Sequence, residues 1–351
     1  MADPLEKKMS NGKKIALVII CLAILLGGYF MLNFYRTYFS PNFTGKQKYL
    51  YVKTGGNLDA LINELESKDL VNSIGEFKKA ATKMNLGENL KPGRYLVKKG
   101  MTNRVVVNMI KAGNQDPVKL KIHNLRTKEN FAAFLAKNLE ADSSQFINVL
   151  DSSNLITKYG FNQDNIYAMF IPNTYNVYWN ENPVDFFIRM NKEYESFWTA
   201  ARKKKAASLN LSPIQVTILA SIVDGEALYD KEMPIIAGLY LNRLNRGQLL
   251  QADPTVIFAN GDFNVKRVTN ILLQTPSLYN TYKYAGLPPG PIMMPSINAI
   301  DAVLNHDKNN YIYMCAKEDF SGYHNFAATQ AEHNANARKY REALNRRKIF
   351  K

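Results

Sequence analysis

The hydrophobic positions of this 351-residue chain follow one pattern near its beginning and another in the rest. Residues 15–32 form an uncharged apolar run of eighteen residues, and residues 33–35 extend it to the length of a bilayer-spanning helix. From about residue 47 onward, short segments of helical and of alternating periodicity follow one another between polar turns. The pattern predicts a single N-terminal transmembrane helix followed by structure of the α+β class.

The charges around the apolar run predict its orientation. Four lysines precede it, at positions 7, 8, 13 and 14, whereas Arg36 is the only basic residue close behind it. By the positive-inside rule, residues 1–14 form a cytoplasmic tail, residues 15–35 span the plasma (inner) membrane, and the rest of the chain lies outside it. A cleaved signal peptide is the alternative, but its apolar core would be shorter and no small-x-small cleavage site follows the run. A retained single-pass anchor is therefore favoured.

Behind a linker at 36–46, residues 47–116 are predicted to form a small α+β module. Asn57 and Thr102 suit the N-cap positions of two of its helices. A turn with proline and glycine precedes its second strand. The predicted elements are strands at 48–52 and 93–97, and helices from 58, at 74–84 and from 102 to 109.

The remaining part, residues 117–351, is predicted as a larger mixed α+β domain. Residues 247–295 interrupt its helical pattern with Gly, Pro, Asn and Tyr, and an irregular segment of this length tends to carry function. The predicted strands lie at 118–122 and 311–316. The predicted helices lie at 129–139, 143–150, 183–204, 213–226, 231–244, 296–304 and 329–346.

Composition narrows the possible partners. The balance of 45 basic to 30 acidic residues gives a net charge of +15, which would suit nucleic acid, anionic lipid or an acidic polymer. No nucleic-acid-binding motif appears and the lysines are spread along the chain, so nucleic acid is not expected, and a solvated basic surface remains the simplest interpretation. Two cysteines and four scattered histidines offer no thiolate or zinc-helix spacing, so no metal or cofactor is expected.

The most informative segment for chemistry is the apolar helix that ends at Glu226. Ser212 and Gln215 make a capping box at its start, and residues 214–223 are apolar almost all round, which predicts a buried core helix. Burial and the negative end of the helix dipole should raise the pKa of a carboxyl at its C-terminal end. A carboxyl that stays protonated near neutral pH can act as the general acid of glycosidic cleavage. The alternative is a solvated acidic helix end.

A string of aromatic and amide residues at 170–179, centred on Tyr175, stands out from the helical pattern. Sugar rings stack on aromatic faces and hydrogen-bond to neighbouring amides, so this string is a candidate saccharide contact. An ordinary β-hairpin packed on a core would have the same composition.

Several strings in order along residues 219–334 closely resemble those of the MltG (YceG-like) endolytic murein transglycosylases. They are LASIV at 219–223, LNRL at 241–244, LQADPTV at 250–256, YNTY at 279–282, GLPPGPI at 286–292, HNF at 324–326 and EHN at 332–334. The resemblance extends more weakly over the 170–178 string, the small module, which resembles the LysM-like subdomain of that family, and the anchor.

The resemblance implies a catalytic acid at Glu226, the last residue of the family's Glu-x-Glu string. This chain departs from the string with Asp224 at its first position, Gly225 where a charged residue is usual, and Ala227 in place of threonine. The implied activity is cleavage of the bond between N-acetylmuramic acid and N-acetylglucosamine to leave 1,6-anhydromuramic ends, and thereby termination of nascent glycan strands. The implied partners are peptidoglycan strands, the plasma membrane and cell-wall synthases.

Further candidates for binding the saccharide or orienting Glu226 come from the same strings and from the aromatic segment. They are Gln251, Asp253, Tyr279, Asn280, Tyr282, His324 and Tyr175. Each is also a plausible structural hydrogen bonder. Asp224 and Glu226 lie about 200° apart around a helix, so they are not expected to form a catalytic pair.

Two alternatives to the lyase stay open. A non-catalytic envelope scaffold could bind glycan through the small module, but it would have no use for a buried acid. A two-carboxylate hydrolase would need a second carboxylate about 5–10 Å from the first, for which Asp253 is the candidate.

Overall fold

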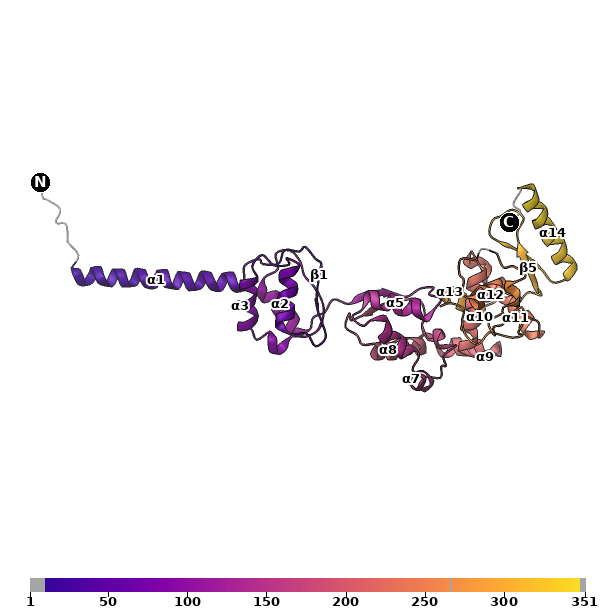
Figure 1. Ribbon diagram of the computed structural model, residues 1–351, viewed down its shortest axis with the longest axis horizontal. Helices are drawn as coiled ribbons and strands as arrows, with labels where there is room; N and C mark the ends of the chain where they lie inside the picture. The colour runs from indigo at the N-terminus through magenta and orange to yellow at the C-terminus, as the bar shows by residue number, and fades with distance from the viewer. Residues whose placement is uncertain (1–9, 266, 348–351) are drawn as a thin grey trace. The chain divides into compact units, whose positions relative to one another are not determined.

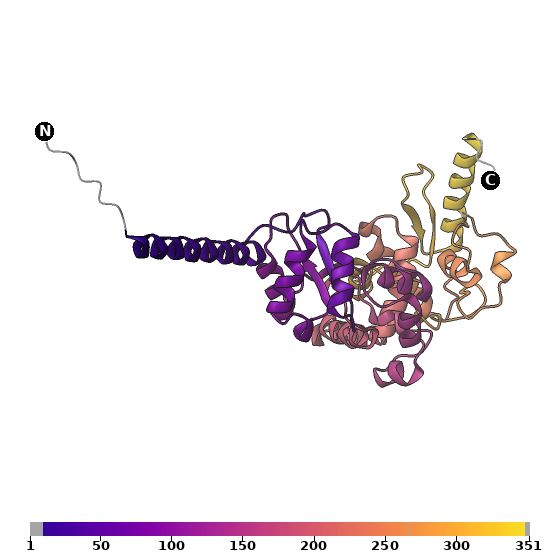
Figure 2. The same cartoon turned by 60° about the vertical axis from the view of Figure 1, so that its left-hand side comes forward.

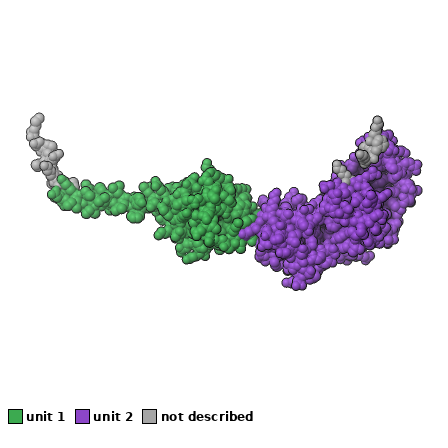
Figure 3. Space-filling view, viewed as in Figure 1, with its two compact units in different colours: residues 1–118, 178–180 green, residues 119–177, 181–351 purple. Residues whose placement is uncertain are grey.

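The computed structural model describes residues 10–265 and 267–347, and it divides into the two compact units coloured in Figure 3. Unit 1 comprises residues 1–118 with 178–180, and unit 2 comprises residues 119–177 with 181–351. Helices and short strands occur in both units, so the mixed α+β class predicted from the sequence is confirmed.

The first element of unit 1 is the long helix α1 (Asn11–Tyr38). Its apolar side chains are exposed along its length, with Ile24 and Leu25 at 68% and 69%. This helix is long and apolar enough to cross a membrane, as the hydrophobic run predicted. Lys7 and Lys8 of the expected cytoplasmic tail lie outside the described residues.

The C-terminal end of α1 packs on the rest of unit 1. Asn103 Nδ2 donates to the carbonyl oxygen of Thr37 at 3.0 Å, and Thr37 Oγ1 donates to the Glu76 carboxylate. Phe43 is only 1% exposed, and its ring meets that of Phe77 edge to face. Residues 37–43, which the sequence suggested were linker, therefore belong to the packed structure of this unit.

The remainder of unit 1 has the element order predicted from periodicity. The strands β1 (Tyr49–Val52) and β2 (Gly93–Leu96) pair antiparallel, with Tyr49 opposite Leu96. The helices are α2 (Leu58–Ser67), α3 (Ile74–Lys83) and α4 (Asn103–Ala112), with N-caps Asn57, Ser73 and Thr102. Their apolar faces enclose one core that includes Leu50, Phe77 and Tyr95.

Unit 2 contains most of the helices. Its first part holds β3 (Val118–Lys121), whose first residue counts with unit 1, α5 (Lys128–Asn138), α6 (Ser143–Leu150), α7 (Ser153–Lys158), β4 (Thr174–Val177) and α8 (Pro183–Phe197). Its second part holds α9 (Ala200–Ser208), α10 (Pro213–Glu226), α11 (Met233–Asn245), α12 (Asp253–Asn260), α13 (Ile297–Leu304), β5 (Tyr313–Ala316), β6 (His324–Ala327) and α14 (Gln330–Arg346).

The apolar helix α10 forms the centre of this second part. Figure 1 shows it among α11, α12 and α13, all of which contact it. Every residue from Val216 to Val223 is buried, as expected for a helix that is apolar all round. The capping box of Ser212 and Gln215 is present at its start. The C-terminal end of α10 is thereby held in place among three other helices.

The hairpin of β5 and β6 and the closing helix α14 pack together. The strands pair antiparallel, with Tyr313 opposite Ala327 and Ala316 opposite His324. Figures 1 and 2 both show α14 alongside this hairpin. The strand β6 was not predicted, because its four residues HNFA carry no clear alternation.

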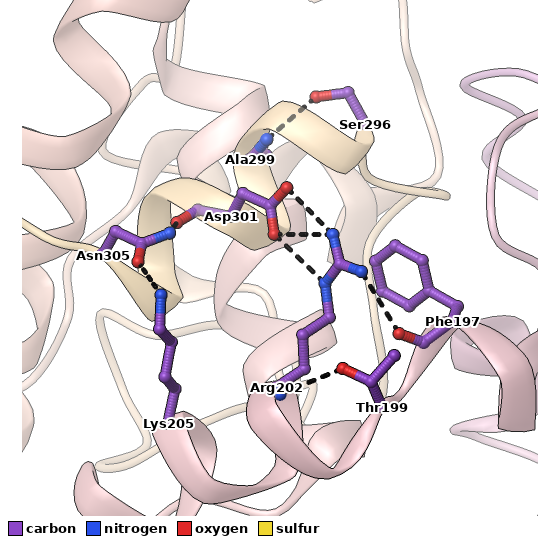
Figure 4. Close-up of polar contacts among 8 residues, drawn as sticks. All are labelled: Phe197, Thr199, Arg202, Lys205, Ser296, Ala299, Asp301 and Asn305. Atoms are coloured by element: carbon purple, nitrogen blue, oxygen red, sulfur yellow. Dashed lines mark hydrogen bonds and ion pairs between the residues drawn. The ribbon is translucent and has the colours of Figure 1, made fainter.

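One predicted helix, at 183–204, is in fact two. The helix α8 ends at Phe197, and Thr199 then caps α9 by accepting the backbone N–H of Arg202. Arg202 reaches both carboxylate oxygens of Asp301 on α13 at 3.1 Å, as Figure 4 shows. This ion pair and the cap fix α9 against α13, which explains why the chain turns after Phe197.

The segment 247–295 is less irregular than its composition predicted. It contains α12, whose second residue is Pro254, a position where a missing backbone N–H costs nothing. The Asp–Pro pair at 253–254 therefore starts a helix within the segment that was expected to be irregular.

Candidate active site

Glu226 opens into a cavity of about 460 Å³ within unit 2. The cavity lies between the end of α10, α11, the start of α12 and the β5–β6 hairpin. We call it the Glu226 cavity. The polar side chains that line it are Glu226, Tyr240, Arg243, Gln251, Asp253, Tyr282, Tyr313, Cys315, His324 and His333.

The carboxyl of Glu226 is partly buried, and its surroundings raise its pKa to about 7. Removal from water is the main cause, and the nearby charge of Asp253 adds to it. Hydrogen bonds from the Tyr240 phenol and from the Asp253 backbone N–H act in the opposite direction. The result is a carboxyl that exchanges its proton near neutral pH, which suits both donation and acceptance.

Asp224 serves a different purpose on the other side of the helix. Its carboxylate accepts the Ser296 backbone N–H at 2.8 Å and the Ser296 hydroxyl at 3.1 Å. These bonds attach the end of α10 to the start of α13. Burial raises the pKa of Asp224, but the residue does not line the Glu226 cavity. The divergence of the two acids expected from helical geometry agrees with these contacts.

The opposite wall of the cavity is built by α12 and the loop before it. Tyr282 donates a 2.6 Å hydrogen bond to Asp253 Oδ1. Gln251 adopts a left-handed backbone conformation at φ 53°, and its side-chain oxygen accepts a hydrogen bond from Arg243. A Cβ at Gly225 would lie 3.0 Å from Pro254 Cβ, so glycine permits the close approach of α12 to the end of α10.

Arg243 is buried, and its hydrogen bonds hold this wall in place. Its guanidinium also donates to the carbonyl oxygens of Leu249 and Ile312, both at 2.7 Å. It thereby joins the loop before α12 to the strand region of the hairpin. In the sequence, Arg243 stood out only as part of the LNRL string at 241–244.

Three of the sequence candidates lie outside the Glu226 cavity. Asn280 is completely buried, and its side chain donates to the carbonyl oxygens of Leu273 and Thr275. Tyr175 is 7% exposed, and its phenol donates to the Ile171 carbonyl at 2.6 Å. Tyr279 packs its ring against Phe258. These contacts explain the three residues as parts of the protein's own packing.

His324 lines the cavity from the first position of β6, and a second acid holds it. Glu232 Oε2 lies 2.8 Å from His324 Nδ1, and Glu232 Oε1 accepts the His324 backbone N–H at 2.7 Å. Glu232 and Tyr240 are not among the residues predicted from the sequence. Nothing local distinguishes them, because their partners lie 92 and 14 positions away.

No group of three or more His, Cys, Asp or Glu side chains within residues 10–265 and 267–347 is placed to hold a metal ion.

Comparisons with known proteins cover most of the chain. The model of the YceG-like family matches residues 50–339. An "Endolytic murein transglycosylase" of Bacillus subtilis (strain 168) is 26% identical over 315 residues, which cover 84% of this chain and 85% of that protein. A protein of the same name from Streptococcus pneumoniae serotype 2 is also 26% identical; the match covers 91% of this chain but 63% of that relative's length.

A solved structure is also similar. The 2.6 Å crystal structure of a YceG-like protein from Listeria monocytogenes matches with a TM-score of 0.56 and 25% identity. The match covers 82% of this chain and 97% of the other.

Proposed function

This chain belongs to the YceG-like family, and on that premise we propose that it is a membrane-anchored endolytic lytic transglycosylase of peptidoglycan with Glu226 as its catalytic acid. The observation that carries the proposal is the environment of Glu226. Its pKa is raised to about 7, it lies at the end of a buried helix, and it faces a cavity large enough for sugar rings. The names of the relatives supply the substrate class.

The reaction needs one carboxyl that acts twice. Glu226 protonates the oxygen between N-acetylmuramic acid and N-acetylglucosamine, and that oxygen leaves with the electron pair of its bond to C1. The Glu226 carboxylate then takes the proton of the muramoyl C6 hydroxyl, whose oxygen bonds to C1. The product ends in 1,6-anhydromuramic acid, and no water is consumed. The attacking group belongs to the same sugar, so it has a high effective concentration.

The contacts of Asp253 favour this single-acid reaction over a two-carboxylate hydrolase. Asp253 would have to activate water or attack C1 in a hydrolase. Its Oδ1 is instead engaged by the Tyr282 phenol at 2.6 Å. In the lyase, Asp253 raises the pKa of Glu226 through its charge, and together with Gln251, Tyr282 and His324 it surrounds the saccharide.

In this proposal the other parts of the chain place the active site next to the cell wall. Residues 15–35 anchor the protein in the plasma membrane with residues 1–14 in the cytoplasm, and the remainder is extracytoplasmic. Residues 47–116 act as a LysM-like glycan-binding module and residues 117–351 as the catalytic domain. Cleavage of nascent strands close to the membrane would terminate glycan elongation, in the neighbourhood of cell-wall synthases.

The test is the product and its dependence on Glu226. A soluble fragment of residues 36–351 is incubated with glycan strands, and the ends are identified by mass spectrometry. The wild type should leave 1,6-anhydromuramic ends without incorporating label from heavy-oxygen water. Glu226→Gln should reduce cleavage about 10²–10⁴-fold and keep glycan binding, because Gln cannot exchange the proton.

Asp224→Asn is the matched control on the same helix end, and it should cost much less activity. Incorporation of the heavy-oxygen label into the products would identify a hydrolase. Full activity of Glu226→Gln would show that Glu226 is not the catalytic acid. Glycan binding by wild type without any cleavage would favour the non-catalytic scaffold.

A further inference from the structure

Glu232 is a buried carboxylate that the proposed reaction does not yet use. It stands directly before Met233, the first residue of α11, where the positive end of the helix dipole favours a negative charge. Only 3% of its side chain is exposed. Both of its oxygens face His324, one toward the backbone N–H and the other toward Nδ1.

These two contacts determine where the imidazole proton lies. An ionised carboxylate only accepts hydrogen bonds, so Nδ1 of His324 carries a proton in order to bond with Oε2. In the neutral ring the lone pair then belongs to Nε2. His324 lines the Glu226 cavity, and Nε2 has no hydrogen-bond partner in the part of the chain that the structure describes. The neutral ring therefore offers a lone pair to whatever occupies the cavity.

Several acceptors of the Glu226 cavity are already bonded within the protein. A saccharide brings hydroxyl groups whose protons each need an acceptor. Three acceptor oxygens of the cavity are already engaged: Glu226 Oε1 by Tyr240, Gln251 Oε1 by Arg243, and Asp253 Oδ1 by Tyr282.

We propose that Glu232 is a positioning residue that holds His324 in the tautomer whose Nε2 accepts a hydrogen bond from a hydroxyl of the saccharide beside Glu226. The proposal rests on the proposed function, because that function supplies the saccharide. His324 contacts the substrate in this arrangement, and Glu232 acts through His324. Neither residue exchanges a proton with the substrate; together they fix the orientation of the sugar whose C1 reacts.

The variant Glu232→Gln tests the tautomer with almost no change of shape. Its amide offers one acceptor and one donor, whereas His324 presents two donors to the original carboxylate. The backbone N–H of His324 can only donate, so the oxygen of the introduced amide has to remain its acceptor. The amide NH₂ then faces Nδ1, which has to become the acceptor, and the ring proton moves to Nε2. Both contacts survive, but the cavity meets an N–H in place of a lone pair.

The first measurement is ¹⁵N NMR of the His324 ring in fragment 36–351 at neutral pH, without substrate. The wild type should show a protonated Nδ1 and an unprotonated Nε2, and Glu232→Gln should show the reverse. The second is kcat/KM on isolated glycan strands, which should fall about tenfold or more, mainly through KM, because the hydroxyl proton loses its acceptor. The melting temperature should stay close to that of the wild type.

Glu318→Gln is the matched control on the same hairpin. Glu318 accepts the Asn325 side-chain N–H at 2.7 Å, and the Gln oxygen can accept the same bond, so kcat/KM should not change. If Glu232→Gln fails to fold, His324→Gln and His324→Leu replace it. The first keeps an acceptor oxygen and should be at least about tenfold more active than the second.

These experiments distinguish a wrong role of Glu232 from a wrong function of the protein. Three outcomes would overturn the role of Glu232. The wild-type ring could be protonated at Nε2, Glu232→Gln could reverse the tautomer and keep full kcat/KM, or the two His324 variants could be equally active. A wild type with the expected tautomer that leaves glycan uncut would instead overturn the proposed function.

Discussion

The phenol of Tyr240 donates a 2.9 Å hydrogen bond to Oε1 of Glu226, across the contact between α11 and α10. Burial and the neighbouring Glu226 raise the pKa of Tyr240 well above its usual value, so the phenol remains a donor at any relevant pH. With Oε1 engaged in this way, the proton of the acid is directed to Oε2. Tyr240 thus sets both the orientation of the candidate acid and part of its pKa.

Tyr240→Phe should therefore shift the pH dependence of activity to higher pH. The hydrogen bond lowers the pKa of Glu226, so its removal should raise that pKa above about 7. The acid then stays protonated to higher pH. The alkaline limb of the pH profile of kcat/KM, measured on glycan strands, therefore shifts to higher pH. The maximal rate should fall, because the carboxyl loses its orientation.

Tyr167→Phe is the control for this shift. The Tyr167 hydroxyl is buried without a hydrogen-bond partner among the described residues, and it does not line the Glu226 cavity. Its loss should leave the pH profile unchanged. An alkaline limb that stays in place, or moves to lower pH, in Tyr240→Phe would contradict the coupling between Tyr240 and Glu226.

The raised pKa of Glu226 should also cost folding stability at neutral pH. In the unfolded chain the carboxyl titrates near 4.5, and in the folded protein near 7. The folded state binds the extra proton between these values, so stability falls as pH rises from about 4.5 to about 7 and stays low above that range. The full effect is at most about 3 kcal/mol.

Glu226→Gln removes this titration and should be the more stable protein above pH 7. Denaturant unfolding of both proteins across pH 4–8 measures the difference, which should widen through the stated window. Two parallel stability curves would mean that the carboxyl is not desolvated as its surroundings indicate.

Local sequence signals predicted most of the elements, and the reasons are visible in single residues. Ser212 and Gln215 form the capping box that their spacing indicated, and Asn57 and Thr102 cap helices where expected. The helix α12 was not predicted, because it lies in the segment 247–295, whose Gly, Pro, Asn and Tyr residues interrupt the helical pattern. Glu232 and Tyr240 could not be found, because their importance depends on tertiary neighbours and leaves no periodic signal.

The positions of Asn280 and Tyr282 predict opposite consequences for two neighbouring residues. Asn280 makes three hydrogen bonds with backbone groups. Asn280→Ala therefore takes this partner from the Leu273 carbonyl and the Tyr282 N–H, while the Thr275 carbonyl keeps only the Ser277 N–H. We expect a loss of about 2–4 kcal/mol of stability, with near-normal specific activity in the folded fraction. Tyr282→Phe should instead reduce turnover more than it lowers the melting temperature, because its phenol acts on Asp253 in the cavity.

Tyr175→Ala extends this comparison to the aromatic string. Tyr175 is buried outside the cavity, so its loss should resemble that of Asn280. If Tyr175→Ala weakens glycan turnover but leaves the stability unchanged, Tyr175 contacts the saccharide after all.

The contacts that follow the apolar helix α1 predict where a soluble fragment has to begin. Asn42 Nδ2 donates to Asn103 Oδ1 at 2.8 Å, and Asn42 Oδ1 accepts the Ser73 N–H at 2.8 Å, while Phe43 is buried in the core of unit 1. A fragment of residues 36–351 keeps these contacts, and a fragment of residues 47–351 loses them. Loss of the Phe43 ring alone should cost about 3–5 kcal/mol, and the unpaired Asn103 and Ser73 groups add to it.

Thermal unfolding of the two fragments measures this difference. In the shorter fragment the transition of unit 1 should occur at a markedly lower temperature or disappear. The Glu226 cavity is lined entirely by residues of unit 2, so cleavage of short glycan strands should be similar in both fragments. Equal unfolding of the two fragments would show that residues 36–46 are a linker after all. Loss of cleavage with an intact unit 2 would show instead that unit 1 contributes to turnover.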